Sequence, residues 1–138
     1  KIPNGGPIIE DRFSVMFSEG VKKGRISINE FVDMVSTRTA KLFGLFPEKG
    51  TIAVGSDADI VIFDPNAERT ISASTHHMNV DYSAFEGMKV TGEPISVLSR
   101  GEFVIRDKQF VGKPGSGQFL KRKRFNSNLQ LSEEKATQ

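Results

Sequence analysis

Residues 50–65 read Gly50-Thr51-Ile52-Ala53-Val54-Gly55-Ser56-Asp57-Ala58-Asp59-Ile60-Val61-Ile62-Phe63-Asp64-Pro65. The four consecutive apolar residues from Ile60 to Phe63 predict a buried strand. Because proline cannot donate a backbone hydrogen bond, we expect this strand to end at Asp64-Pro65. Two glycines bracket Thr51 to Val54, a segment that could form a short strand of its own. The pattern before this stretch is helical and the pattern after it is that of strands, so it joins two different halves.

The first half begins with a loop rich in glycine and proline, from Lys1 to Pro7. Apolar residues then recur at helical spacing and predict an amphipathic helix over Ile8–Glu19. Glu10 and Asp11 lie in its expected first turn, where carboxylates suit the helix dipole. Glu10 could also pair with Arg12 and hold the loop.

Two further helices are expected before residue 47. Ser27 and Glu30 have the spacing of a capping box, which predicts that a helix starts there. A second cap at Thr37 would start a short helix over Arg38–Phe43, closed by Gly44. All three helices have one apolar face, and nothing in this half supplies a sheet for them to cover.

The second half predicts short strands. They are expected at Thr70–Ser74, at Val90, and over Ile95–Leu98, Phe103–Ile105 and Gln109–Val111. Gly92-Glu93-Pro94 would separate two of them, and Arg100-Gly101 and Asp107-Lys108 would form hairpin turns. A loop over Asp81–Gly87 would hold one turn of helix around Ala84-Phe85. The pattern therefore predicts helices that lack a sheet and strands whose edges lack partners.

Composition sets limits on function. The chain has 138 residues, 26% of them charged, and a net charge of +2, with no cysteine. The absence of cysteine excludes disulfides and thiolate metal sites and fits a cytoplasmic protein. No apolar run approaches the roughly 18 residues that a membrane span needs. The excess positive charge lies in the tail, at Lys121-Arg122-Lys123-Arg124, so no basic face for nucleic acid is expected. This run is interpreted as a solvated arm or an inter-subunit contact.

Several motifs together resemble the C-terminal signature of the cyclic amidohydrolases, among them the D-hydantoinases and dihydropyrimidinases. The resemblance extends from Lys1 to about Arg122. Besides Lys49-Gly50-Thr51-Ile52 and Gly55 to Val61, it is carried by Ile2-Pro3-Asn4-Gly5-Gly6-Pro7, Ile9-Glu10-Asp11-Arg12, Ser36-Thr37, Ala40-Lys41-Leu42-Phe43-Gly44, Thr75-His76-His77, Phe85-Glu86-Gly87-Met88 and Gly115-Ser116-Gly117. Each piece is weak alone, but their order and spacing together are specific.

This resemblance implies that the chain is the C-terminal third of a larger enzyme. It also implies the fold class α/β plus β for such a chain. Residues 1–46 would be the C-terminal helices of a (β/α)8 barrel, residues 47–115 would be strands of a composite β-sandwich, and residues 116–138 would be a C-terminal arm. The N-terminal remainder of the same protein would complete both layers. The resemblance also implies a homodimer or homotetramer, in which the arm contacts a neighbouring subunit.

The resemblance implies a binuclear zinc centre whose histidine, carboxylated lysine and aspartate ligands lie upstream of Lys1. We therefore expect no metal ligand and no catalytic residue in this chain. His76 and His77 are adjacent and would point to opposite sides of an extended segment, which makes them a poor joint ligand set. Asp57, Asp59 and Asp64 flank the expected strand and are interpreted as turn and capping residues.

Asn4 is the one candidate for substrate binding. The resemblance implies that its loop follows the last barrel strand and that the main-chain groups of Asn4 hydrogen-bond a cyclic imide or ureide ring. A backbone donor and acceptor suit a flat ring with alternating N–H and C=O groups. Gly5 and Gly6 would allow close approach of the backbone. The alternative is an asparagine that serves only the turn.

Two functions are compatible with these observations. The first is a D-hydantoinase or dihydropyrimidinase-like hydrolase that opens small cyclic amides. The second is a non-catalytic interaction protein of the collapsin response mediator type, which shares the pattern but lacks the zinc ligands. An isolated C-terminal fragment that survives as an oligomer is a third possibility.

Overall fold

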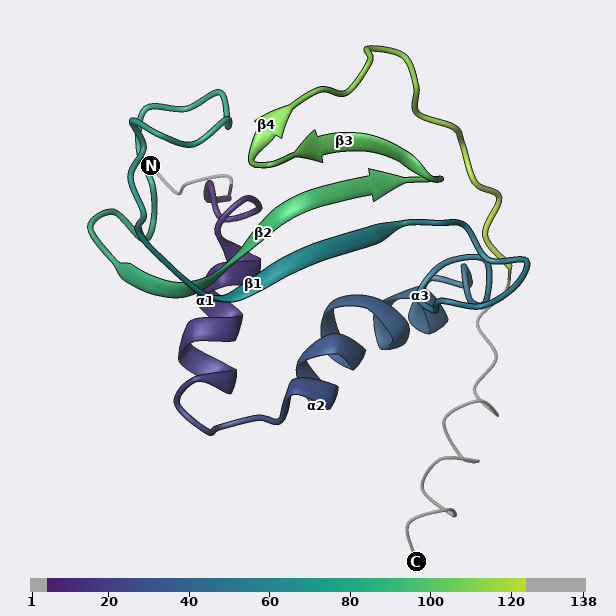
Figure 1. Cartoon of the computed structure of the whole chain (residues 1–138), viewed down its shortest axis with the longest axis horizontal. Coiled ribbons are helices and arrows are strands. Elements are labelled where there is room, and N and C mark those ends of the chain that lie inside the picture. The colour runs from purple at the N-terminus through teal and green to yellow at the C-terminus, as the bar shows by residue number, and fades with distance from the viewer. Residues whose placement is uncertain (1–4, 124–138) are drawn as a thin grey trace, which may run out of the picture. The chain divides into compact units, whose positions relative to one another are not determined.

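The computed structural model describes residues 5–123. Its element order is a helical part followed by four strands (Figure 1). The sheet has the order β1-β2-β3-β4. Helices therefore precede an antiparallel meander, as the sequence predicts. The C-terminal arm lies largely in residues 124–138, outside the described part, and so does Asn4.

The chain divides into two compact units. The first comprises Lys1–Phe31 and Val61–Ser96, and the second comprises Val32–Ile60 and Val97–Gln138. These units group the chain differently from the sequential boundaries at residues 46 and 115, which remain predictions about the domains of a larger protein.

In the first unit, α1 (Arg12–Met16) continues into the π-helical turn η1 (Phe17–Val21). Its backbone hydrogen bonds join residues five positions apart, as from the Lys22 amide to the Phe17 carbonyl at 3.0 Å. The helix therefore begins four residues later than predicted. Glu10 and Asp11 precede it, and Asp11 makes no side-chain capping bond. Their carboxylates have other partners, described below.

The second helical run begins at a confirmed capping box. The Glu30 amide lies 3.2 Å from Ser27 Oγ, and the Ser27 amide donates to Glu30 Oε2 at 2.7 Å. α2 (Ile28–Val32), η2 (Asp33–Thr37) and α3 (Arg38–Leu42) then follow without a break. The predicted second cap at Thr37 is wrong: its backbone is helical, and its hydroxyl donates to the Gly50 carbonyl at 2.7 Å instead.

Gly44 closes α3 as predicted. Its φ is +69°, the left-handed region that favours glycine. The Gly44 amide donates to Lys41 O at 3.1 Å and the Leu45 amide to Ala40 O at 2.8 Å, which is the Schellman pattern. The backbone of Lys123 crosses this cap and donates to the Gly44 carbonyl at 2.8 Å.

The strands are longer than the sequence suggests. β1 covers Ile60–Thr70 and passes through Pro65, and β2 covers Lys89–Ser99 and passes through Gly92 and Pro94. The predicted end at Asp64-Pro65 is wrong: β1 lies at the edge of the sheet, where a strand pairs on one side only and proline is tolerated. Nor is β1 buried throughout, since Val61 and Ile62 are 43% and 50% exposed.

Two tight turns join the remaining strands, β3 (Glu102–Arg106) and β4 (Gln109–Phe110). Both predicted turns are confirmed: Arg100, Gly101, Asp107 and Lys108 all have positive φ. β2 and β3 pair with a register shift between Val97 and Leu98.

Two other strand predictions fail. Residues 51–54 form no strand, and Ile52 and Val54 are 85% and 109% exposed. Thr70 is the last residue of β1, and Ala73 to Thr75 form a turn instead of a strand. The turn of helix predicted around Ala84-Phe85 is a turn without helix, over residues 84–87.

The first unit contains an aromatic core. Phe17 and Phe31 are each 3% exposed, and their ring centroids lie 5.6 Å apart. Phe63 of β1 lies 4.8 Å from Phe17, and Phe13 lies 5.4 Å from Phe31. Such edge-on pairs contribute about 0.5–1.5 kcal/mol beyond simple area burial. These rings pack α1 and η1 against β1. They therefore determine where the segment preceding α1 lies.

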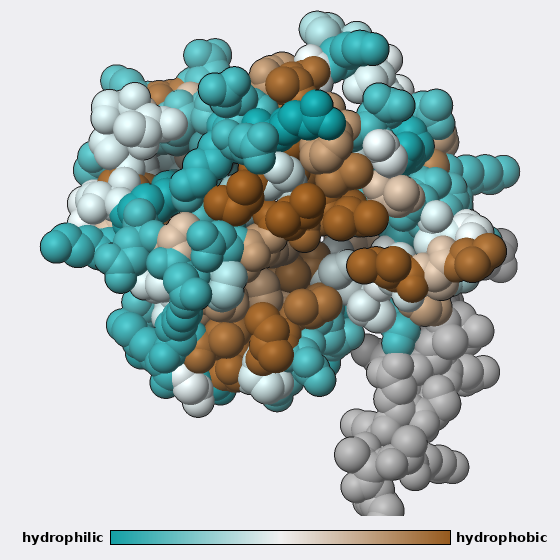
Figure 2. Space-filling model, in the orientation of Figure 1, coloured by the Kyte–Doolittle hydropathy of each residue, from teal (hydrophilic) through white to brown (hydrophobic). Residues whose placement is uncertain are grey.

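Many apolar side chains are not covered (Figure 2). In the second unit, Ala40 is the one hydrophobic residue that is buried in the described part of the chain. Its exposed large side chains include Leu42, Phe43, Phe110 and Phe119. A self-sufficient domain would bury more of them. No helix in residues 5–123 is long and apolar enough to cross a membrane.

Candidate functional site

The candidate site is the segment that follows the Asn4 loop, together with the side chains that hold it. Asn4 itself lies outside the described residues. Gly5 to Glu10 lead into α1, and Pro7 within this segment is buried. The Ile8 amide donates to the Gly6 carbonyl and the Arg12 amide to the Ile8 carbonyl, both at 3.0 Å. These bonds make the segment a compact turn.

Asp11 anchors this turn from the inside. It is 1% exposed, and its Oδ1 accepts from Arg69 Nη2 at 3.0 Å. Its Oδ2 accepts from Ser83 Oγ at 3.3 Å. Arg69 belongs to β1, and its Nε lies 3.8 Å from Glu93 Oε1 on β2. A carboxylate so deeply buried is tolerated only when it is paired and hydrogen-bonded, as this one is.

Glu10 makes a second anchor, towards the loop after β1. Its Oε2 accepts from the His77 amide at 2.7 Å, and its Oε1 lies 2.9 Å from His77 Nδ1. Partial burial, the largest influence, raises the pKa of Glu10, but the bonds from the side chain and amide of His77 outweigh it, so the pKa lies below its usual value. The predicted Glu10–Arg12 pair is thus replaced by Glu10–His77.

The two adjacent histidines have different surroundings. His77 contacts Glu10 and is 76% exposed at its side chain. His76 Nδ1 accepts from the Met78 amide at 3.1 Å, and its Nε2 is buried without a hydrogen-bond partner in the described residues. They do not converge on one point. Within residues 5–123, no group of three or more histidines and carboxylates could hold a metal ion.

The loop that carries Ser83 and His77 is itself held in place. Glu86 Oε2 accepts from the Ala73 amide at 2.7 Å. This bond and one from Ser72 hold the pKa of Glu86 below its usual value. His77, which binds Glu10, and Ser83, which binds Asp11, therefore lie on a loop that this bond braces, whereas Arg69 lies on β1.

Of the three aspartates predicted to serve turns or caps, Asp59 and Asp64 accept backbone amides, whereas the side chain of Asp57 makes an ion pair. Asp57 and Asp59 both pair with Lys49, and Asp59 also accepts from the Arg100 amide at 2.8 Å. Asp64 accepts from the Asn66 amide at 2.8 Å. None of the three faces another carboxylate across a cavity in the arrangement that general acid–base catalysis needs.

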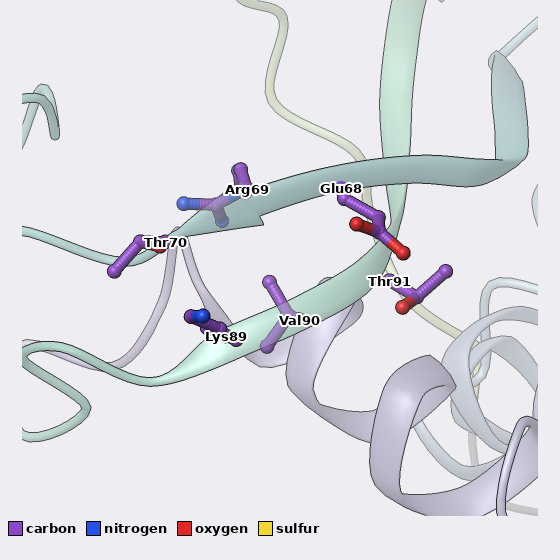
Figure 3. Close-up of a pocket in the computed structure, with 6 residues that line it drawn as sticks. All are labelled: Glu68, Arg69, Thr70, Lys89, Val90 and Thr91. Atoms are coloured by element: carbon purple, nitrogen blue, oxygen red, sulfur yellow. The ribbon is translucent and has the colours of Figure 1, made fainter.

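A hollow of about 440 Å³ lies beside Arg69 (Figure 3). Six residues of the neighbouring strands β1 and β2 line it: Glu68, Arg69, Thr70, Lys89, Val90 and Thr91. It is large enough for a small ring. It contains no histidine, and its one apolar side chain is Val90. No metal-holding group of histidines and carboxylates occurs in residues 5–123, this lining included, so we assign the hollow no catalytic role.

Sequence reasoning missed the Asp11–Arg69–Ser83 network. The sequence placed Asp11 in the expected first helical turn and in the motif Ile9-Glu10-Asp11-Arg12, but it indicated no partner for its side chain. Arg69 is 58 positions away and Ser83 is 72. No spacing rule connects residues so far apart, because only the tertiary fold brings them together.

The chain is similar to a known protein family and to proteins of known activity. Residues 8–104 match the model described as "Amidohydrolase family". The chain is 77% identical over 127 residues to a D-hydantoinase of Geobacillus stearothermophilus, covering 92% of this chain and 27% of that protein. It is 51% identical over 125 residues to a dihydropyrimidinase of Rattus norvegicus, covering 91% of this chain and 24% of that protein.

A solved D-hydantoinase structure agrees with the fold. It superimposes with a TM-score of 0.89 at 80% sequence identity, over 92% of this chain and 28% of that one. The chain therefore spans about a quarter of the length of the relatives it matches. The names of these relatives give no support to the alternative of a non-catalytic collapsin response mediator type.

Proposed function

The chain belongs to the amidohydrolase family, and from this we propose that it is the C-terminal part of a D-hydantoinase or dihydropyrimidinase-like hydrolase. The whole protein would open the C–N bond of small cyclic amides such as hydantoins and dihydropyrimidines. The observation that carries the proposal is the identity of 77% over 92% of this chain with a D-hydantoinase. The uncovered apolar side chains and the small core of the second unit support the view that more protein packs here.

The role of this part would be structural and substrate-binding. Its helices would be the last ones of a (β/α)8 barrel, within residues 1–46, and its strands would complete a β-sandwich within residues 47–115. Residues 116–138 would form the arm that contacts a neighbouring subunit of a homodimer or homotetramer. The substrate contact would come from the main chain of Asn4, in the loop before α1.

The described residues do not fit a zinc centre. Residues 5–123 bring no three ligands together, and the two histidines diverge. No step of ring opening is therefore assigned to this part of the chain. A binuclear zinc centre, which the family resemblance implies, would be held by residues upstream of Lys1. The protein would act in the cytoplasm.

The test is an assay of the full-length protein with hydantoin and dihydrouracil, before and after metal removal. We expect ring opening that is lost with a chelator and restored by zinc. The isolated 138-residue chain should show no turnover and should bind zinc at well below one equivalent. Turnover by the isolated chain, or no ring opening by the zinc-loaded full-length protein, would refute the proposal.

Asn4 can be tested with a matched pair of variants. Asn4→Ala keeps both main-chain groups, so we expect KM to change less than about threefold. Asn4→Pro removes the backbone N–H, so we expect KM to rise at least about tenfold. Equal effects of the two substitutions would show that the side chain, or the turn alone, matters.

A further inference from the structure

Two adjacent acids, Glu10 and Asp11, hold the segment before α1 from two directions. Asp11 is bonded to Arg69 of β1 and to Ser83, whereas Glu10 is bonded twice to His77. A segment held at one point can pivot about it. A segment held at neighbouring residues by partners on different parts of the fold cannot, so its orientation is fixed as well as its position.

The cost of burying Asp11 indicates that this fixation matters. A buried ion pair contributes little net stability compared with apolar groups of the same shape, because both charges lose their hydration. The pair does impose one geometry, since Arg69 presents its donors in a rigid planar fork. What Asp11 and Arg69 add over an apolar contact is therefore a defined placement.

This placement extends towards the Asn4 loop. The bonds from the Ile8 amide to Gly6 and from the Arg12 amide to Ile8 leave little freedom between Asp11 and Gly6. Pro7 in the middle is buried and has a fixed φ. Any rotation at Asp11 is thus passed on to Gly5 and Gly6, which directly follow Asn4.

We propose that Asp11 and Arg69 are positioning residues for substrate binding: their ion pair holds the turn of residues 5–10 so that the preceding main chain can reach the ring of the substrate. The inference rests on the proposed function, because it assumes that Asn4 contacts a cyclic amide. It assigns no chemistry to either side chain. It differs from a purely stabilising role in predicting a defect in substrate binding, beyond what lost stability explains.

The experiment compares three variants of the full-length, zinc-loaded protein. Asp11→Asn removes the charge, and Arg69→Lys keeps the charge but loses the fork. Lys49→Met is the control, because it breaks a partly buried ion pair in the other compact unit. For each we would measure kcat, KM, bound zinc and the thermal midpoint.

We expect Asp11→Asn and Arg69→Lys to raise KM for dihydrouracil or hydantoin about tenfold, with kcat changed less than about threefold and zinc content unchanged. Lys49→Met should lower the thermal midpoint and leave KM within about twofold of wild type. If Asp11→Asn does not fold, Arg69→Lys carries the test. The proposal fails if KM stays at the wild-type value in Arg69→Lys, or if Lys49→Met raises KM equally.

Hydrogen exchange separates this proposal from the proposed function. The hydrogen-bonded amides of Ile8 and Arg12 should exchange at least about tenfold faster in Arg69→Lys than in wild type, and at the wild-type rate in Lys49→Met. This readout needs no activity. Faster exchange in a protein that opens no ring would refute the proposed function but support the positioning role of the Asp11–Arg69 pair. Unchanged exchange rates in Arg69→Lys would refute that positioning role.

Discussion

At the scale of single residues, Gly92 shows how one position can be determined by its neighbours. It has φ +96° within β2, and a Cβ placed there would lie 2.3 Å from Phe17 Cδ1 and 2.9 Å from Phe63 Cζ. We expect Gly92→Ala to lower the free energy of unfolding of the full-length protein by about 2–4 kcal/mol, from backbone strain together with overpacking. Urea titration would measure the change.

Gly55 provides the matched control for this prediction. Its φ is +90°, but a Cβ there would meet nothing within 4 Å. Gly55→Ala therefore carries only the backbone strain and should cost about 1 kcal/mol. Equal losses for the two substitutions would mean that the aromatic rings move aside and that their packing does not require glycine.

The residues of the candidate site were only partly predictable. The sequence resemblance pointed to Asn4, and residue spacing correctly gave Ser27 and Glu30 as a capping box. Asp11, in contrast, carried no signal for its burial, since its partner Arg69 lies on a strand 58 positions later. Local rules identify caps and turns because these involve neighbours in sequence, whereas buried ion pairs depend on the tertiary fold.

At the scale of elements, the missed boundaries share one cause. Proline and glycine were expected to end strands at residues 64–65 and 92–94. Instead, β1 tolerates Pro65 at a sheet edge, and β2 uses Gly92 where two aromatic rings approach the backbone. Thr37 likewise looked like a cap, but its hydroxyl is taken by the Gly50 carbonyl. In each case the position of the residue in the folded chain overrides its local preference.

The connection between α3 and β1 has no regular structure, and an ion-pair cluster holds it. Lys49 pairs with Asp57 at 2.7 Å and with Asp59, which also accepts from the Arg100 amide. Burial would raise the pKa of Asp59, but the bonds from Lys49 and Arg100 outweigh it, so the net pKa is lowered. Burial would lower the pKa of Lys49, but its two aspartates raise it above its usual value.

These directions predict a pH window. The contribution of Asp59 is present above its unfolded pKa, about 4, and is lost as the pH falls through the lower folded pKa. The contribution of Lys49 is present below its unfolded pKa, about 10.4, and is lost as the pH rises through the higher folded pKa. Lys49→Met should therefore lower the free energy of unfolding by about 1 kcal/mol between roughly pH 5 and 10, and by less below and above this pH range.

Urea titrations of wild type and Lys49→Met at several pH values would measure this difference. Arg38→Met is the control, because the Arg38–Asp33 pair is exposed on one helical run and should contribute less than about 0.5 kcal/mol. A difference between wild type and Lys49→Met that stays constant down to pH 2 would contradict the assignment of this window to Asp59.

At the scale of the whole molecule, the question is what the uncovered apolar surface means. Ile9 and Ile28 in the first unit are 74% and 50% exposed, and Phe110 and Phe119 in the second are 66% and 93% exposed. Exposed hydrophobic residues are ordinary when single, but so many large ones in a chain of this size mark surfaces that pack against other protein. The sequence indicated this incompleteness through helices without a sheet.

The isolated 138-residue chain should therefore behave differently from the full-length protein. We expect the chain to self-associate at micromolar concentration and to bind a hydrophobic dye at least about fivefold more strongly per residue than the full-length protein does. Sedimentation velocity and dye fluorescence would measure both. The reason is physical: apolar area that the rest of the protein does not cover gains about 25 cal/mol per Å² when another surface covers it. A monomeric chain that unfolds cooperatively and binds no dye would show that these side chains need no partner, and that the uncovered surface does not support assigning this chain to a larger hydrolase.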